Sequence, residues 1–159
     1  MANFFRANEI AKTAVEVERK GRAFYLRLEE SARSGKTREL FNYLAVEEGR
    51  HEEIFQALLD RLGDIELPAW ATKDEYATYI QGLIESHALF SDQKAEKRMA
   101  AIEDEKEAIL MAMGFEKDTL LFFTEMESFV PDREKTVVRE CIKEERLHLA
   151  RLQRMLAEL

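Results

Sequence analysis

Apolar residues recur at every third or fourth position along four long stretches of this sequence, a spacing that is typical of amphipathic α-helices. Helix-breaking residues are scarce, since only 2 prolines and 6 glycines occur among 159 residues. Strong helix formers such as Ala, Leu, Glu, Lys and Arg dominate the composition. We therefore expect an all-α fold and exclude a β-sandwich or a β-barrel.

Turn and capping signals divide the chain into helices and connections. The periodic stretches cover about residues 8–34, 37–62, 94–128 and 132–159. The first two stretches meet so closely, at Ser34 and Gly35, that they must form an antiparallel hairpin, and Thr37 is the expected N-cap of the second helix. Residues of about 64–93 contain a loop-like segment around Pro68 and then a short helical pattern, so we interpret them as a long crossover.

Four long helices with two short turns and one long crossover between the second and the third describe a ferritin-like four-helix bundle. A chain of 159 residues has the size that builds one core, so we expect a single domain over residues 1–159 with its crossover at about 64–93. Other all-helical folds share this periodicity. The periodicity alone therefore does not identify a ferritin-like bundle, and the polar residues on the helix faces have to distinguish it from other helical folds.

The charge balance of the chain excludes several classes of function. With 32 Asp and Glu against 24 Lys and Arg, the formal net charge is −8, so we expect neither nucleic acid nor a membrane surface as a partner. The one cysteine, Cys141, cannot form an internal disulfide or a thiolate metal site. The first residues lack the apolar run of a signal peptide, and no transmembrane stretch follows, so we expect a cytoplasmic protein.

Polar residues on the apolar faces of the four helices are the most informative feature of the chain. The first and third helices carry one glutamate each, and the second and fourth carry a glutamate and a histidine three positions apart: Glu18, Glu116, Glu48 with His51, and Glu145 with His148. The two halves repeat this pattern, because Glu18 precedes Glu48 by 30 residues and Glu116 precedes Glu145 by 29. Two hairpins related by an approximate twofold axis would bring the six side chains to one place.

Four carboxylates at one buried place need compensating positive charge, because an uncompensated buried carboxylate costs several kcal/mol. Two divalent cations would balance the charge of the four glutamates. Carboxylate and imidazole suit iron and manganese, and this ligand set does not distinguish iron, manganese or a mixed pair. One glutamate from each of two helices, with Glu-x-x-His from each of the other two, is the di-iron carboxylate constellation. A structural bundle with an empty, partly protonated cluster is the alternative interpretation.

On these residues the chain resembles the rubrerythrin-type, ferritin-like di-iron proteins, and it is more similar to their single-domain, erythrin-like members. The resemblance extends from Glu18 to about Leu159. It implies two iron ions, as Fe2+ or Fe3+, with terminal ligands on the first and third helices, bridging ligands on the second and fourth, and one histidine for each metal. By this resemblance, the terminal ligands are Glu18 and Glu116 and the bridging ligands are Glu48 and Glu145. The histidine ligands are His51 and His148.

The chain departs from rubrerythrins proper in ways that bear on mechanism. Those proteins carry a rubredoxin-like iron site on two CxxC pairs, for which a sequence with only Cys141 has no residues. We therefore expect electrons to come from another protein. The peroxidases of that group have a further glutamate one turn beyond the third-helix ligand, where this chain has Thr119. Phe123 stands where the first half has Tyr25, so only one phenol is available at this register.

Three residues near the expected site each have two interpretations. Tyr25 could hydrogen-bond a ligand carboxylate or donate an electron, which would give it a catalytic role, or it could simply pack in the core. Gly21, one turn beyond Glu18, could leave space for a bound oxidant or for a close helix neighbour. His87 lies outside the repeat, and we expect it to be structural rather than a ligand.

Taken together, the residues and the resemblance predict a di-iron oxidoreductase. It would bind two Fe(II) in the bundle core and reduce O2 or H2O2 as an oxidase or peroxidase in defence against oxidative stress. The alternative function is ferroxidase-linked iron storage or delivery. The resemblance also implies an external electron-donor protein and a homodimer.

Overall fold

The computed structural model describes residues 7–63, 74–87 and 92–159, and these residues form helices and no strand. The helices are α1 (Ala7–Ser31), α2 (Gly35–Leu62), α3 (Asp74–Ser86), α4 (Asp92–Ala100), α5 (Glu105–Met126) and α6 (Asp132–Glu158), with a short 3-10 helix, η2 (Glu127–Phe129), after α5. The expected all-α fold is confirmed. Within the described ranges, no helix is long and apolar enough to cross a lipid bilayer.

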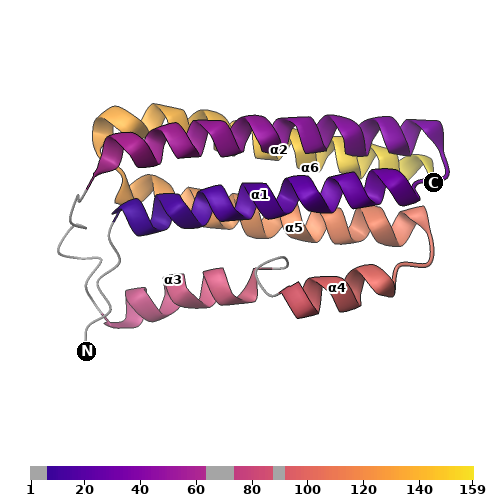
Figure 1. Cartoon of the computed structure of the whole chain (residues 1–159), viewed down its shortest axis with the longest axis horizontal. Coiled ribbons are helices and arrows are strands. Elements are labelled where there is room, and N and C mark those ends of the chain that lie inside the picture. The colour runs from indigo at the N-terminus through magenta and orange to yellow at the C-terminus, as the bar shows by residue number, and fades with distance from the viewer. Residues whose placement is uncertain (1–6, 64–73, 88–91) are drawn as a thin grey trace.

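Four long helices, α1, α2, α5 and α6, lie side by side along the molecule (Figure 1). One antiparallel hairpin consists of α1 and α2, and the other consists of α5 and α6 (Figure 1). The shorter helices α3 and α4 follow one another along the outside of the bundle, where α3 contacts α5. They return the chain along the length of the bundle, so α5 runs in the same direction as α2. This arrangement is the predicted ferritin-like bundle with a long crossover.

The turn between α1 and α2 is held by a cap and by a contact from the second hairpin. Ser34 is the N-cap of α2, rather than Thr37 as expected, because its hydroxyl accepts from the backbone N–H of Thr37 at 3.4 Å. Thr37 is buried in the first turn, and its hydroxyl donates to Glu105 Oε2 at 3.0 Å. Glu105 Oε1 accepts from the backbone N–H groups of Arg33 and Ser34, each at 2.6 Å. The first residue of α5 thus fastens one hairpin to the other.

The third long helix begins later than the apolar pattern predicts. The pattern predicts one unbroken helix from about Lys94, whereas the structure has two separate helices there, α4 and α5. Asp104 begins the new helix, because its side chain accepts from the backbone N–H of Glu107 at 2.8 Å and so caps α5. Glu107 in turn accepts from the backbone N–H of Glu103 at 2.8 Å. The crossover therefore extends to residue 104, and its segment around Pro68 lies outside the described residues.

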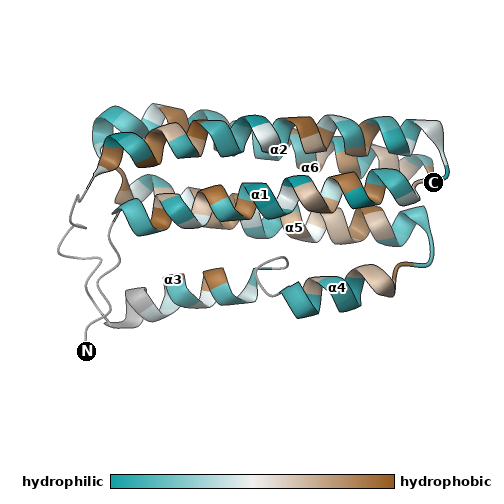
Figure 2. Ribbon diagram, in the orientation of Figure 1, coloured by the Kyte–Doolittle hydropathy of each residue, from teal (hydrophilic) through white to brown (hydrophobic). Residues whose placement is uncertain are grey.

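Two apolar clusters fill the two ends of the bundle and leave a polar layer between them. Figure 2 shows hydrophobic and hydrophilic residues interspersed along all four long helices. Each long helix contributes to both clusters: Val15, Phe55, Phe123 and Ile142 belong to one, and Tyr25, Ala45, Met113 and Leu152 belong to the other. The stretch of each helix between these contributions carries the inward-facing glutamate. The apolar clusters therefore screen the polar layer from solvent at both ends.

Candidate metal centre

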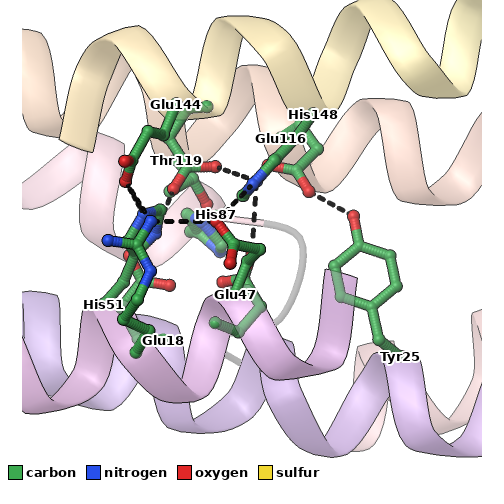
Figure 3. Close-up of polar contacts among 12 residues, drawn as sticks. Glu18, Tyr25, Glu47, His51, His87, Glu116, Thr119, Glu144 and His148 are labelled. Atoms are coloured by element: carbon green, nitrogen blue, oxygen red, sulfur yellow. Dashed lines mark hydrogen bonds and ion pairs between the residues drawn. The ribbon is translucent and has the colours of Figure 1, made fainter. Parts of the chain in front are cut away.

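The six polar residues that the sequence singles out converge in the layer between the two apolar clusters. Figure 3 labels four of them, Glu18, His51, Glu116 and His148. Each of them is at most 1% exposed. The first hairpin supplies Glu18 from α1 and Glu48 and His51 from α2, and the second supplies Glu116 from α5 and Glu145 and His148 from α6. They face inward because helical register aligns them with apolar residues one or two turns away on the same helix face.

Their ligand atoms form two overlapping groups. Glu18 and His51 define the first position, Glu116 and His148 define the second position, and both groups include Glu48 and Glu145. Within each group the ligand atoms all lie within 4.8 Å of one another. A carboxylate that belongs to both groups has two oxygens to offer, so the shared pair stands where bridging ligands are expected. The geometry suits two metal ions side by side.

Many of the oxygen and nitrogen atoms of this cluster lack hydrogen-bond partners from the protein. Among the residues that the structure describes, buried side-chain atoms without a hydrogen bond include both oxygens of Glu18 and Glu48, one oxygen each of Glu116 and Glu145, and one ring nitrogen each of His51 and His148. His51 Nδ1 lies only 2.7 Å from Glu145 Oε1, yet the pair is not aligned as donor and acceptor. An unsatisfied buried polar group costs about 1–3 kcal/mol. Metal ions would take up the unpaired carboxylate oxygens and His51 Nδ1 as ligands, so these residues fit a metal pair. In His148 the unpaired Nε2 is the outer nitrogen, and Nδ1 faces the carboxylates of the cluster.

Burial makes the cluster hold protons when no cation balances it. Burial is the main reason that the pKa values of Glu18, Glu48 and Glu116 lie well above their usual range, and neighbouring carboxylates add to the effect. Glu145 differs, because burial raises its pKa but its close contacts with the two histidines outweigh burial and lower it. Burial also opposes the charged form of His51, but its contacts with Glu145 prevail and raise its pKa to about 9. Metal binding would release these protons.

A second layer of charged residues surrounds the histidines. His51 turns Nδ1 toward the carboxylates, and its outward Nε2–H donates to Glu144 Oε2 at 2.7 Å. Arg50 donates to Glu144 Oε2 at 2.6 Å and to Glu47 Oε2 at 2.9 Å. On the other side, Glu47 Oε2 lies 3.9 Å from His148 Nε2. The sequence did not signal the role of Arg50, whose only mark is its helical spacing of three from Glu47.

Tyr25 contacts the centre through Glu116. The phenol is fully buried, and its hydroxyl donates a hydrogen bond to Glu116 Oε1 (Figure 3). Its ring stacks on Phe41 at 6.2 Å between centroids and meets Phe115 edge-on at 5.8 Å. Burial, and then the charge of Glu116, raises the pKa of the phenol, so Tyr25 is a hydrogen-bond donor at neutral pH. The bond joins α1 to the candidate ligand Glu116 on α5, rather than to Glu18 of its own helix.

Gly21 forms a notch in α1 that is filled by two neighbours. A Cβ atom at this position would lie 2.5 Å from Phe115 Cζ and 2.8 Å from Glu48 Oε2. Contacts this short are too close for a real side chain, so Gly21 is needed for the approach of both groups. Of its two interpretations, the structure supports a close helix neighbour, since the notch holds the phenyl ring and a shared carboxylate oxygen.

We predict that Gly21→Ala displaces Glu48 and weakens metal binding by about tenfold or more, because overpacking a tight contact costs about 1–3 kcal/mol. Gly114→Ala in α5 is the matched control, since a Cβ atom there meets nothing within 4 Å. The control should gain up to about 1 kcal/mol of stability from the better helix former and keep its metal affinity. Metal titration and thermal unfolding of both variants test the prediction, and equal affinities would contradict it.

His87 lies beside the centre without belonging to either group of ligand atoms. It is 4% exposed, its Nε2 lies 3.0 Å from Thr119 Oγ1, and its ring packs edge-on against Phe115 at 5.5 Å. Burial and the nearby charge of Lys20 lower the pKa of His87 to about 4, so its ring is neutral at pH 7. These contacts agree with the structural role expected from the sequence.

Comparisons with known proteins bear on the family of the chain. A family model described as Rubrerythrin matches residues 9–156. Among solved structures, the chain is similar to a Thermotoga maritima protein that is described as ferritin-like and diiron-carboxylate, with a TM-score of 0.73 and 25% sequence identity. That similarity covers 98% of this chain and 97% of the other. No curated protein matches the chain.

Proposed function

Because the chain belongs to the rubrerythrin family, we propose that its buried glutamates and histidines bind two iron ions and that this pair reduces O2 or H2O2. The observation that carries the proposal is the overlap of two groups of ligand atoms on the same two carboxylates, Glu48 and Glu145. The similarity to a diiron-carboxylate protein supports iron as the metal. Manganese or a mixed pair fits the same ligand atoms.

The balance of charge and ligand types supports a pair of divalent cations. Four glutamates carry −4 when ionised, and two divalent cations carry +4, so the filled centre has no net charge from these groups. Each metal position offers one carboxylate and one imidazole of its own besides the shared carboxylates. A bound iron pair would supply the change of oxidation state that reduction of an oxidant requires.

The protein's own residues would orient the metal ligands and exclude bulk water from the site. The apolar clusters on either side keep bulk water from the polar layer. Glu144 accepts from His51 Nε2, which leaves Nδ1 of that ring as the atom that faces the cluster. The hydroxyl of Tyr25 donates a hydrogen bond to one oxygen of Glu116, and the raised pKa of the phenol keeps the proton on the Tyr25 oxygen.

Two further parts of the proposal follow from the resemblance. This sequence has one cysteine and no CxxC pair, and we propose that a separate protein delivers the electrons. From the resemblance alone, we propose that the chain acts as a homodimer. Thr119 stands where the peroxidases have an additional glutamate, and its hydroxyl is paired with His87. Both O2 and H2O2 therefore remain candidates as the oxidant.

Anaerobic iron titration followed by exposure to each oxidant tests the proposal. We expect about two Fe(II) per chain, and we expect ferric absorption to grow on mixing with O2 or H2O2, with the faster oxidant being the substrate. Repeated cycles with a chemical reductant should give turnover at a constant amount of bound iron. No bound iron would refute the proposal, and accumulation far beyond two per chain would indicate iron storage instead.

A further inference from the structure

The internal repeat makes the two metal positions comparable, residue by residue. Each position has one glutamate and one histidine of its own, and both share Glu48 and Glu145. The ligand types are therefore identical. Any difference between the two positions must come from the residues that contact the ligands, and these break the symmetry of the repeat in two places.

The two histidines differ in the carboxylate behind them. Nε2 of His51 lies 2.7 Å from Glu144 Oε2, at hydrogen-bond distance. Nε2 of His148 has no hydrogen bond in the described part of the chain, and the equivalent carboxylate oxygen, Oε2 of Glu47, lies 3.9 Å away. A carboxylate that accepts from the outer nitrogen of an imidazole makes the inner nitrogen a stronger electron donor. The first position therefore has the stronger histidine ligand.

One arginine links the carboxylates behind the two histidines. Arg50 of α2 contacts both Glu47 and Glu144, whereas the equivalent residue of α6 is Leu147, which is 55% exposed and has no charge. Arg50 therefore holds both of these carboxylates and does not by itself distinguish the two positions. The second hairpin provides no arginine of its own at this register.

The two terminal carboxylates also differ. The hydroxyl of Tyr25 donates to Glu116, which draws electron density from that carboxylate. Neither oxygen of Glu18 has a hydrogen-bond partner among the described residues. The residue equivalent to Tyr25 in the second half is Phe123, which has no hydroxyl to donate. The first position therefore has the stronger terminal carboxylate as well as the stronger histidine.

We infer that the two metal positions are unequal, and that the position of Glu18 and His51 binds a divalent cation first and more tightly than the position of Glu116 and His148. This inference rests on the proposed function only in that the cluster binds two cations. The order of filling is set by two residues: Glu144 strengthens the first position, and Tyr25 weakens the second.

Calorimetric titration of the metal-free protein with Mn2+ tests the inequality. We expect two resolved binding steps in the unaltered chain. Glu144→Gln should weaken the tighter step by about tenfold, since loss of an outer partner of a ligand histidine typically costs that much affinity. Glu47→Gln is the control from the other half of the repeat and should change either step by less. Tyr25→Phe should strengthen the looser step by about fivefold, because a hydrogen bond no longer competes for Glu116.

Anomalous diffraction identifies which position fills first. Crystals of the metal-free protein soaked with one equivalent of Mn2+ per chain should show their stronger peak between Glu18 and His51, and Glu144→Gln should make the two peaks more equal. Two equal steps, or equal effects of Glu47→Gln and Glu144→Gln, would overturn the inference and leave two-metal binding intact. Absence of any Mn2+ and Fe2+ binding would overturn the proposed function. Thermal unfolding of each variant verifies that it folds.

Discussion

Glu48→Gln is expected to abolish paired metal binding while leaving the metal-free protein folded and more stable at pH 8. The carboxylate of Glu48 belongs to both groups of ligand atoms, so its loss removes a ligand from both metal positions. A glutamine amide is a far weaker metal ligand than a carboxylate. The same change removes a buried carboxylate whose ionised form is destabilised by burial and by the charge of Glu18. For this reason we expect the metal-free protein to become more stable.

Elemental analysis and urea unfolding with and without metal measure both effects. We expect the metal content to fall from about two ions per chain to one or none. The stabilisation by metal should decrease accordingly. For one site, it is about 2.7 kcal/mol when free metal is in a hundredfold excess over the dissociation constant. Glu53→Gln is the matched control, because Glu53 lies on the same helix but is exposed. If Glu48→Gln kept two metal ions per chain, the assignment of the metal centre would be wrong.

Between pH 5 and pH 8 the metal-free protein is expected to lose stability as the pH rises. The pKa values of Glu18, Glu48 and Glu116 are raised in the folded state, so the folded protein keeps protons that the unfolded chain has released. The stability from this effect is fully present below the unfolded pKa, about 4.3 for glutamate, and is lost as the pH rises through the folded values. Each proton retained gives a slope of about 1.4 kcal/mol per pH unit.

Two further groups of the centre, His51 and Glu145, do not reverse this slope. The pKa of His51 is raised to about 9, so its contribution is present below its unfolded value of about 6.5 and is lost as the pH rises toward 9. The pKa of Glu145 is lowered, so its contribution is lost only when the pH falls below the usual range of glutamate. Both groups therefore leave the predicted decline intact between pH 5 and pH 8.

Metal ions should flatten the decline, because they displace the same protons. We expect the difference in unfolding free energy between the Mn2+-bound protein and the protein in EDTA to widen as the pH rises from 5.5 to 8. Glu116→Gln should show a shallower metal-free slope, since it removes one of the groups that keep a proton. A metal-free stability that instead increases with pH over this range would show that the buried carboxylates are already ionised.

The sequence predicted the inward-facing residues well because helical register is a local property. Once a stretch is helical, the spacing of its apolar residues determines which positions face the core, and Glu18 and Glu116 were found in this way without knowledge of any neighbour. The errors concern helix ends. The caps Ser34 and Asp104 each compete with another plausible start, and only hydrogen-bond geometry decides between them.

The contacts between side chains of different helices could not be predicted from the sequence. The partner of Tyr25 is Glu116 on α5, and the notch at Gly21 is filled by Phe115 of that helix and by Glu48 of α2. Such pairs depend on how far each helix is rotated and shifted against its neighbour, which no local pattern encodes. Arg50 is a similar case, because only the packing of α2 against α6 brings Glu144 within its reach.

By itself, the sequence determined that this chain is a helical bundle whose two halves each aim two glutamates and a histidine at the core. Those conclusions need only the period of the helix and the cost of burying charge. The tertiary structure decided which carboxylates are shared between the two groups, which histidine is backed by Glu144, and which carboxylate is held by Tyr25. These differences arise from side chains that meet across helices, so a repeat that is symmetric in its ligands becomes a centre that is unequal in its surroundings.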